Sequence, residues 1–206
     1  DPDTNAVPTI VEQLSDKGWN TGIISTSSVT HATPGSFFAH AALRSMEEEI
    51  ARQMVYSELD FVAGGGYKWF ADRTDKVNYL DSLTSKGFVV DTISMDSDMA
   101  KNDRPVYLLA ADGMPTMREG RGDFLLNASK KAITHLSAKP EPFLLMIEGS
   151  QIDWGGHAND ADYLITELLD FDKTVGAVFD YAKDQGNTLV IITADHETGG
   201  FTLSSK

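Results

Sequence analysis

Two short apolar runs separated by a long helical pattern most constrain what this chain can fold into. Residues 143–147 (FLLMI) and 188–193 (TLVIIT) are rich in Leu, Ile and Val, the composition of strands buried on both faces. Between them, residues 159–185 carry apolar side chains at helical spacing. Because a long helical crossover joins parallel strands, the pattern predicts a parallel sheet.

The same alternation of helix and strand runs through the rest of the chain. It predicts an α/β layered fold with a mainly parallel central sheet flanked by helices, in one domain over residues 1–206. The expected strands are 22–26, 60–63, 88–91, 106–110, 143–147 and 188–193. The expected helices are 7–17, 34–57, 75–86, 123–138 and 159–185.

Composition excludes several functional classes. The formal charge of −14 argues against a nucleic-acid backbone as partner. No apolar run approaches the ~18 residues of a membrane span. Cysteine is absent, which excludes disulfides, thiolate catalysis and cysteine-based zinc sites.

Acidic and histidine side chains follow both apolar runs, 143–147 and 188–193. Glu148, Asp153 and His157 follow the first run, and Asp195 and His196 follow the second. In parallel sheets ligands bind outside the carboxyl ends of the strands, so both clusters are expected on one rim. Five such ligands suit zinc or another divalent cation.

Each cluster taken alone has an ordinary structural interpretation. Asp153 and His157 lie on one face of a helix if the segment is helical, but two glycines between them also allow a simple turn with a surface histidine. Adjacent strand residues such as Asp195 and His196 point to opposite faces. The metal hypothesis rests on the coincidence of the clusters.

A histidine, a threonine and a proline follow the strand expected at 22–26 and open the next helix. Thr33 is the expected N-cap, with Pro34 in the first turn. His31 and Thr33 would then lie beside a helix N-terminus, where anions are favoured. Arg44 is either a surface charge or a fork for phosphate oxygens. In an unbroken helix it would start ~15 Å beyond Thr33, so reaching that phosphate requires a bend or a break.

These residues resemble the alkaline phosphatase family. Four segments look like the family's motifs and occur in the family's order over nearly the whole chain. They are residues 30–34 with 39–40 and Arg44, residues 60–66, residues 148–153 with His157, and residues 193–200. The resemblance implies a three-layer fold of the alkaline phosphatase type.

The resemblance also implies three metal sites. Asp153 and His157 would bind a first zinc ion, and Asp195 and His196 a second. Glu148 and Thr33 would belong to a third site, of the magnesium type or for another divalent ion. Arg44 would bind the substrate phosphate, and His31 and Trp154 would lie near the phosphate and the third metal.

Some of the family's residues have no counterpart in this chain. The family's nucleophile is a serine in an Asp-Ser-Ala-type motif upstream of the His31 region, and no such motif occurs here. An aspartate that bridges two metals and a last zinc-binding histidine, expected beyond Lys206, are also missing. Ser150 and the serines at 25, 27 and 28 are interpreted as structural. We therefore expect an incomplete part of a larger phosphatase domain, inactive by itself.

The resemblance implies metal-dependent hydrolysis of small-molecule phosphate monoesters through a phosphoserine intermediate in the full-length parent. The alternatives are a phosphodiesterase or sulfatase of the same superfamily, and a non-catalytic protein that binds metal or phosphate. The matches at Arg44 and Thr33 favour the monoesterase. A periplasmic or secreted location and a possible homodimer are expected. The lack of the family's first strand is expected to leave backbone groups unpaired at the sheet.

Overall fold

One parallel sheet organises the computed structural model of this protein, which describes residues 5–198. The strands are β1 (Asn20–Ser28), β2 (Phe61–Gly65), β3 (Phe88–Asp91), β4 (Arg104–Leu108) and β5 (Phe143–Glu148). Their order is β3-β4-β2-β1-β5, and every neighbouring pair is parallel. The helices are α1 (Ile10–Ser15), α2 (Ala32–Ser36), α3 (Glu47–Met54), α4 (Lys68–Ala71), α5 (Tyr79–Ser85), the 3-10 turn η1 (Met117–Glu119), α6 (Phe124–Ser137), α7 (Gln151–His157) and α8 (Ala161–Gln185).

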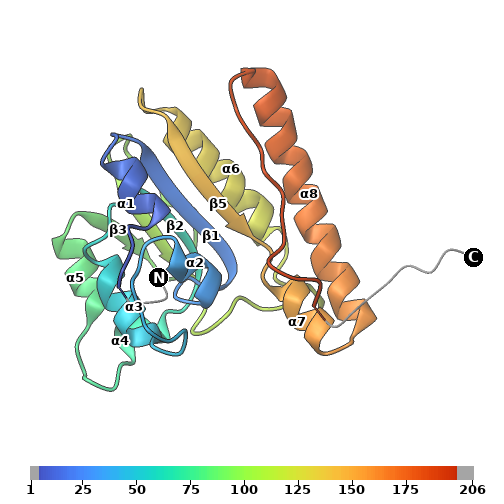
Figure 1. Ribbon diagram of the computed structural model, residues 1–206, viewed down its shortest axis with the longest axis horizontal. Coiled ribbons are helices and arrows are strands. Elements are labelled where there is room, and N and C mark those ends of the chain that lie inside the picture. The colour runs from blue at the N-terminus through green and yellow to red at the C-terminus, as the bar shows by residue number, and fades with distance from the viewer. Residues whose placement is uncertain (1–4, 199–206) are drawn as a thin grey trace, which may run out of the picture.

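The sheet separates two apolar cores, which makes three layers (Figure 1). Adjacent residues of β1 supply one side chain to each core, since strand residues alternate between faces. Ile23 packs with α1, α3, α4 and α5 on one face, and Ile24 packs with α6 on the other. The predicted α/β fold with a parallel central sheet and flanking helices is confirmed. No helix within residues 5–198 is long and apolar enough to cross a membrane.

The strand expected at 188–193 is wrong. These residues form no ladder, and Leu189, Ile191 and Ile192 are 82%, 75% and 53% exposed. The segment returns alongside α8 toward α7, as Figure 1 shows, while β5 forms the edge of the sheet. An apolar run gives a segment the tendency to form a strand, but it becomes one only by pairing with another strand, and this segment does not pair with the edge strand β5.

The single helix expected at 34–57 is two helices, α2 and α3, joined by a loop that carries Arg44. The side-chain amide of Gln53 stabilises this loop by hydrogen bonds to the backbone of His40. It accepts a hydrogen bond from the backbone N–H of His40 at 2.7 Å and donates one to the carbonyl of His40 at 2.9 Å. These bonds replace the helical partners of His40, so the chain can leave the helix without unpaired backbone groups.

The N-cap predicted at Thr33 is also wrong. His31 occupies the N-cap of α2 and makes no side-chain cap bond, and Thr33 is the second residue of the helix. Pro34 lies in the first turn, as expected. Thr33 is therefore free to direct its hydroxyl at another group, which the rim of the sheet supplies.

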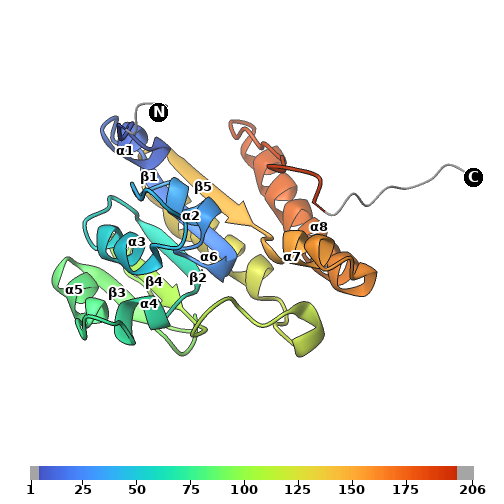
Figure 2. The same ribbon diagram turned by 60° about the horizontal axis from the view of Figure 1, so that its bottom comes forward.

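Close packing of α7 on α8 explains the two glycines between Asp153 and His157. A Cβ atom on Gly155 would lie 2.6 Å from the backbone nitrogen of Leu164, and one on Gly156 would lie 3.0 Å from the Thr198 side chain. In Figure 2, α7 and α8 stand together beyond β5. The glycines therefore do not interrupt α7; they admit α8 and the segment that follows it.

A pair of leucine substitutions tests the placement of the segment 188–193. Leu136→Ala removes a fully buried side chain and is expected to lower the free energy of unfolding by about 2–5 kcal/mol. Leu189→Ala removes a side chain that is 82% exposed and is expected to change it by less than about 0.5 kcal/mol. Urea unfolding of both variants measures the difference. A large loss at Leu189 would mean that this segment packs into a core in solution.

Candidate metal centre and phosphate site

A buried carboxylate lies at the carboxyl end of the two neighbouring strands β1 and β5. The parallel register pairs Ser25 with Glu148, and the Ser25 hydroxyl donates to the Glu148 carboxylate at 2.6 Å. Thr33 also hydrogen-bonds to this carboxylate, so the structure brings together the two residues predicted for the third metal site. Burial raises the pKa of the Glu148 carboxyl, and the hydrogen bonds from Ser25 and Thr33 partly offset that rise.

A cluster of hydroxyl groups surrounds Glu148, and the sequence interpretation did not foresee its role. Ser25 Oγ lies 2.8 Å from Ser27 Oγ and 3.1 Å from Ser150 Oγ, and Ser150 Oγ lies 3.1 Å from Thr26 Oγ1. Ser25 thus orients a predicted ligand, and the interpretation of these serines as structural rather than nucleophilic stays a prediction. The signal in the sequence was a run of five hydroxyl residues at the end of a strand, residues 25–28 and Thr30.

Asp153 and His157 lie on one face of α7, as their spacing predicted. His157 Nε2 is 3.4 Å from Asp153 Oδ1 across one turn of the helix. The side chains are 36% and 65% exposed, respectively, so both are open to solvent. The alternative of a simple turn with an unrelated surface histidine does not hold, because the segment is helical.

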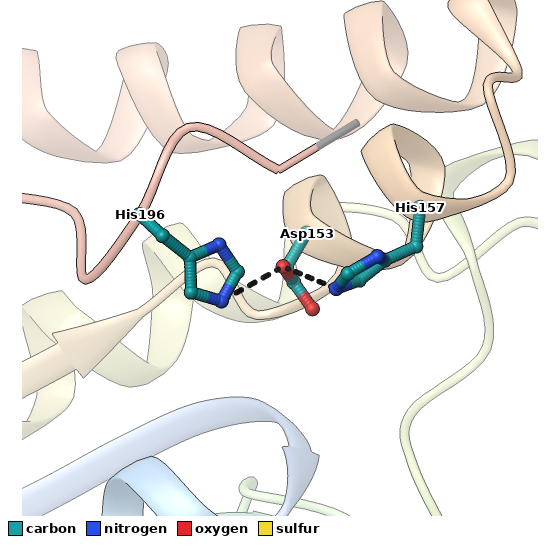
Figure 3. Close-up of side chains that lie close together, drawn as sticks. All are labelled: Asp153, His157 and His196. Carbon is teal, nitrogen blue, oxygen red and sulfur yellow. Dashed lines mark ion pairs between the residues drawn. The ribbon is translucent and has the colours of Figure 1, made fainter. Parts of the chain in front are cut away.

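The segment after α8 brings His196 to the same place, although it forms no strand. Figure 3 shows His196 and His157 on opposite sides of the Asp153 carboxylate. His196 Nε2 lies 3.8 Å from Asp153 Oδ1. One ligand atom from each of the three residues lies within 4.8 Å of the others. The two motifs therefore meet at Asp153, although the strand from which their meeting was expected does not form.

Thr198 joins Asp153 to His196 by hydrogen bonds, and it was not identified from the sequence. Its hydroxyl donates to Asp153 Oδ1 at 2.6 Å and lies 2.6 Å from His196 Nδ1. The one signal in the sequence was that Thr198 lies two residues after the predicted ligand His196. Gly199 and Gly200, which end the same motif, lie outside the described residues.

Asp195 is less closely associated with the centre. Its side chain is 78% exposed, and its Oδ2 atom lies 3.4 Å from Nε2 of the adjacent His196. It does not belong to the described group whose ligand atoms lie within 4.8 Å of one another. Of the five ligands expected around the zinc ions and the rim, the structure places Asp153, His157 and His196 together, Glu148 in the hydroxyl cluster, and Asp195 at the margin.

Arg44 is connected to the rim of the sheet by its contact with His31. The break between α2 and α3 lets Arg44 Nη2 come within 3.1 Å of His31 Nε2. The His31 ring packs edge-on against Trp154, with ring centroids 5.9 Å apart. Trp154 is the neighbour of Asp153 on α7, so these contacts connect the predicted phosphate arginine to the helix that bears the metal ligands. His31 Nδ1 is buried and has no hydrogen-bond partner in the described structure.

Gln151 ties α7 to the rim and was also missed. Its side chain is fully buried, and its amide nitrogen donates to the carbonyls of Thr26 at 2.9 Å and Met114 at 2.6 Å. The Tyr163 hydroxyl of α8 donates to its amide oxygen at 2.8 Å. One side chain thus joins β1, the loop before η1 and α8 at the turn that carries Asp153.

The donor set fits divalent metal ions. Two imidazoles and a carboxylate suit zinc, whose ligand atoms in a tetrahedral site lie roughly 3.3 Å apart because the bonds are about 2.0–2.1 Å long. The observed separations of 3.4 and 3.8 Å are close to that value. The all-oxygen set of Glu148 and Thr33 suits magnesium, with the unpartnered His31 Nδ1 nearby in the same hydroxyl-rich region.

Comparison with known proteins places the sequence in one family. A sequence model described as "Alkaline phosphatase" matches residues 1–206. Alkaline phosphatase 3 of Bacillus subtilis strain 168 is 37% identical over 215 residues, covering 100% of this chain and 46% of the relative. The Escherichia coli K12 alkaline phosphatase is 30% identical, covering 92% of this chain and 51% of the relative.

Solved structures agree with this assignment. The alkaline phosphatase of the Antarctic bacterium TAB5 has a TM-score of 0.95 and 51% identity, covering 99% of this chain and 61% of that one. A mutant of that enzyme with Mg bound is equally similar, with a TM-score of 0.95. The fold is therefore of the alkaline phosphatase type, as the sequence predicted. This chain spans about half the length of the curated relatives named above.

The buried charge on Glu148 gives a stability prediction with a definite sign. Because burial raises the pKa of this carboxyl, its ionised form at neutral pH costs stability, and that cost disappears as the pH falls below 4.5, the ordinary value. Glu148→Gln is therefore expected to raise the thermal midpoint of the metal-free chain at pH 7, and to raise it less in acid. Differential scanning calorimetry measures this effect.

Glu119→Gln is the matched control for that experiment. Hydrogen bonds from Thr116 lower the pKa of Glu119, so removal of its charge is expected to lower the midpoint at neutral pH. If the two variants shift the midpoint in the same direction, the assigned cost of burying Glu148 is wrong.

Gln151→Leu tests whether the buried amide positions the metal ligands. The variant leaves two carbonyls and the Tyr163 hydroxyl without their partner, and we expect zinc affinity to fall by roughly 10–100-fold. Gln13→Leu, which removes an exposed amide bonded only to the Pro8 carbonyl, should leave the affinity unchanged. Calorimetric zinc titration at a temperature where both variants are folded measures the effect. Equal affinities would show that Gln151 does not position α7.

Proposed function

Because this chain belongs to the alkaline phosphatase family, we propose that the protein hydrolyses phosphate monoesters in a metal-dependent reaction. The observation that carries the proposal is the convergence of Asp153, His157 and His196, whose ligand atoms lie within 4.8 Å of one another. Their position beside the carboxyl ends of parallel strands is where ligands bind in such sheets.

The proposed reaction uses zinc ions and a third, magnesium-type ion. Asp153 and His157 would hold the first zinc, Asp195 and His196 the second, and Glu148 with Thr33 the third ion. Bound metal ions supply Lewis-acid stabilisation of the attacking and leaving oxygens in an in-line displacement.

The residues of this chain bind and orient the phosphate. The Arg44 guanidinium, which lies 3.1 Å from His31 Nε2, is the proposed fork for two non-bridging phosphate oxygens. The His31 ring, which packs edge-on against Trp154 of α7, lies between that arginine and α7. Gln53 keeps the Arg44 loop out of the helix, so the fork can face the rim.

We propose a phosphoserine intermediate, on a serine that is not among these 206 residues. The proposed activity is therefore that of a longer protein, and the 206-residue chain alone is expected to be inactive. The serines near Glu148 are hydrogen-bonded within the hydroxyl cluster and are not proposed as nucleophiles.

A periplasmic or secreted location and a homodimer are further proposals. Both are supported by the family resemblance alone. Small-molecule phosphate monoesters are the proposed substrates.

Two alternative functions can be distinguished from the proposed phosphate monoesterase by the substrates that the protein hydrolyses. A phosphodiesterase or sulfatase of the same superfamily would need no arginine placed beside a helix N-terminus, whereas Arg44 and Thr33 both reach this rim. A non-catalytic metal-binding protein would keep Asp153 and His157 but turn over none of these esters.

Activity of the protein expressed from its full gene tests the proposal. It is expected to hydrolyse p-nitrophenyl phosphate in zinc, to act much more slowly on bis(p-nitrophenyl) phosphate and p-nitrophenyl sulfate, and to lose activity in EDTA. Arg44→Ala is expected to lower kcat/KM on the order of 10²-fold, because it removes stabilisation of charge on the phosphate oxygens.

Lys173→Ala is the control for Arg44→Ala. It also removes a surface cation, paired with Asp123 at 2.7 Å on another part of the molecule, and should not change kcat/KM. Preference for the diester or the sulfate would contradict the proposed substrate class. Zinc binding without turnover of any ester would favour the non-catalytic alternative.

A further inference from the structure

We propose that the hydrogen bond between Thr30 and Glu47 positions Arg44 to bind phosphate. The inference rests on the proposed function, because it takes Arg44 as the residue that binds the phosphate oxygens. Thr30 is a fully buried residue two positions after β1, and Glu47 is the first residue of α3. The Thr30 hydroxyl donates to Glu47 Oε2 at 2.7 Å, across the base of the loop that carries Arg44.

Side-chain packing does not hold the Arg44 loop in place. Residues 41–46 are all exposed, and the apolar side chains of Leu43 and Met46 are 64% and 40% exposed. The backbone N–H of Met46 donates to the carbonyl of Leu43 at 3.1 Å, which closes a turn around Arg44. This bond shapes the turn but does not connect it to the sheet. The place of the turn therefore depends on the contacts at its ends.

Two contacts join the turn to adjacent residues that follow β1. Arg44 Nη2 lies 3.1 Å from His31 Nε2, and Glu47, three residues after Arg44, accepts the hydrogen bond from Thr30. A single contact would let the turn pivot, whereas two contacts to neighbouring residues set both its position and its direction. Because the guanidinium changes its contacts when phosphate binds, the bond between Thr30 and Glu47 is the fixed contact from which Arg44 extends.

Ser28 in turn fixes the direction of the Thr30 hydroxyl. Ser28 Oγ lies 2.6 Å from Thr30 Oγ1 and accepts a hydrogen bond from the Thr30 backbone N–H at 3.2 Å. A threonine hydroxyl has one hydrogen, and Thr30 gives it to Glu47, so the Ser28 hydroxyl donates to Thr30. A buried series of hydrogen bonds thus runs from the last residue of β1 to the first residue of α3.

The same hydrogen bond engages a carboxylate that could otherwise pair with Arg44. Arg44 and Glu47 have opposite charges and are three residues apart, yet Arg44 forms no ion pair with a carboxylate of residues 5–198. A guanidinium paired with a carboxylate must give up that partner before it binds phosphate, because both anions use the same N–H donors. Thr30 therefore keeps the Arg44 guanidinium available.

Binding of inorganic phosphate to the zinc-loaded protein expressed from its full gene, measured by calorimetry, tests the proposal. Thr30→Val and Glu47→Ala are each expected to weaken phosphate binding roughly tenfold, the contribution of one hydrogen bond to a charged group. Thr30→Ser keeps the hydroxyl, and Glu47→Gln keeps an oxygen that accepts from Thr30. Both conservative variants are therefore expected to bind phosphate within about twofold of the parent protein.

Glu48→Ala and Thr74→Val are the matched controls. Glu48, the neighbour of Glu47 on α3, accepts hydrogen bonds from the backbone N–H and the hydroxyl of Thr74, each at 2.8 Å. These variants remove the same groups from a bond outside the Arg44 loop and should leave phosphate affinity unchanged. Glu47 is only partly buried, so Glu47→Ala tests the proposal even if Thr30→Val does not fold. A lower thermal midpoint in Glu47→Ala with unchanged phosphate affinity would show a merely structural role and overturn the proposal.

A double-mutant cycle with Arg44→Ala shows whether the effect acts through the arginine. We expect Glu47→Ala to cause no further loss of phosphate affinity once Arg44 is removed. The same roughly tenfold loss in that background would overturn the positioning role.

The outcomes separate this inference from the proposed function. If Arg44→Ala weakens phosphate binding and Glu47→Ala does not, the positioning role alone is wrong. If Arg44→Ala leaves the affinity unchanged, Arg44 is not the phosphate fork, and the inference fails with it. The expected pattern supports the positioning role even if the full protein hydrolyses no phosphate monoester.

Discussion

The parallel pairing of β1 with β5 is the constraint on which the candidate site depends. The register sets Ser25 beside Glu148, so the hydroxyl cluster and the carboxylate meet where both strands end. Every other part of the site is placed relative to this point. Thr33 follows from β1, α7 follows from β5, and the Gln151 amide returns from α7 to the Thr26 carbonyl. A shift of this register by one residue would turn each side chain to the opposite face of the sheet.

Much of the fold follows from the periodicity of the sequence. Strand β3 was predicted with the bounds that the structure shows, and α6 and β5 to within one residue at each end. These elements have apolar side chains that match one period and clear end signals. The segment 188–193 has an equally strong pattern and forms no strand, because the pattern records an apolar tendency and does not determine whether the segment pairs with the edge strand β5. The helix expected at 34–57 failed for a related reason: a distant side-chain amide, that of Gln53, competes for the backbone of His40.

The candidate site likewise contains residues that the sequence predicted and residues that it did not. Spacing along the chain paired Asp153 with His157, because the two share a helix face, whereas only the family resemblance paired Glu148 with Thr33. They did not identify Gln151, Ser25 or Thr198, which act through contacts between segments far apart in the sequence. Nor did they separate Asp195 from its neighbour His196. Only the path of the backbone after α8 determines which of two adjacent ligand-type residues faces the centre.

The long separations along the chain within the site have a kinetic consequence. The Gln151 side chain meets the Thr26 carbonyl across 125 residues, and Ser25 meets Glu148 across 123. Contacts this distant require closure of most of the chain, and their entropic cost precedes their gain. The strands β1, β2, β3 and β4 are all made before β5, so in a nascent chain on the ribosome the ends of β1 and β5 cannot meet until β5 has been made. The contact of the hydroxyl cluster with Glu148 therefore forms only after β5 has emerged, and chains released before β5 is complete would lack the Glu148 carboxylate that this cluster surrounds.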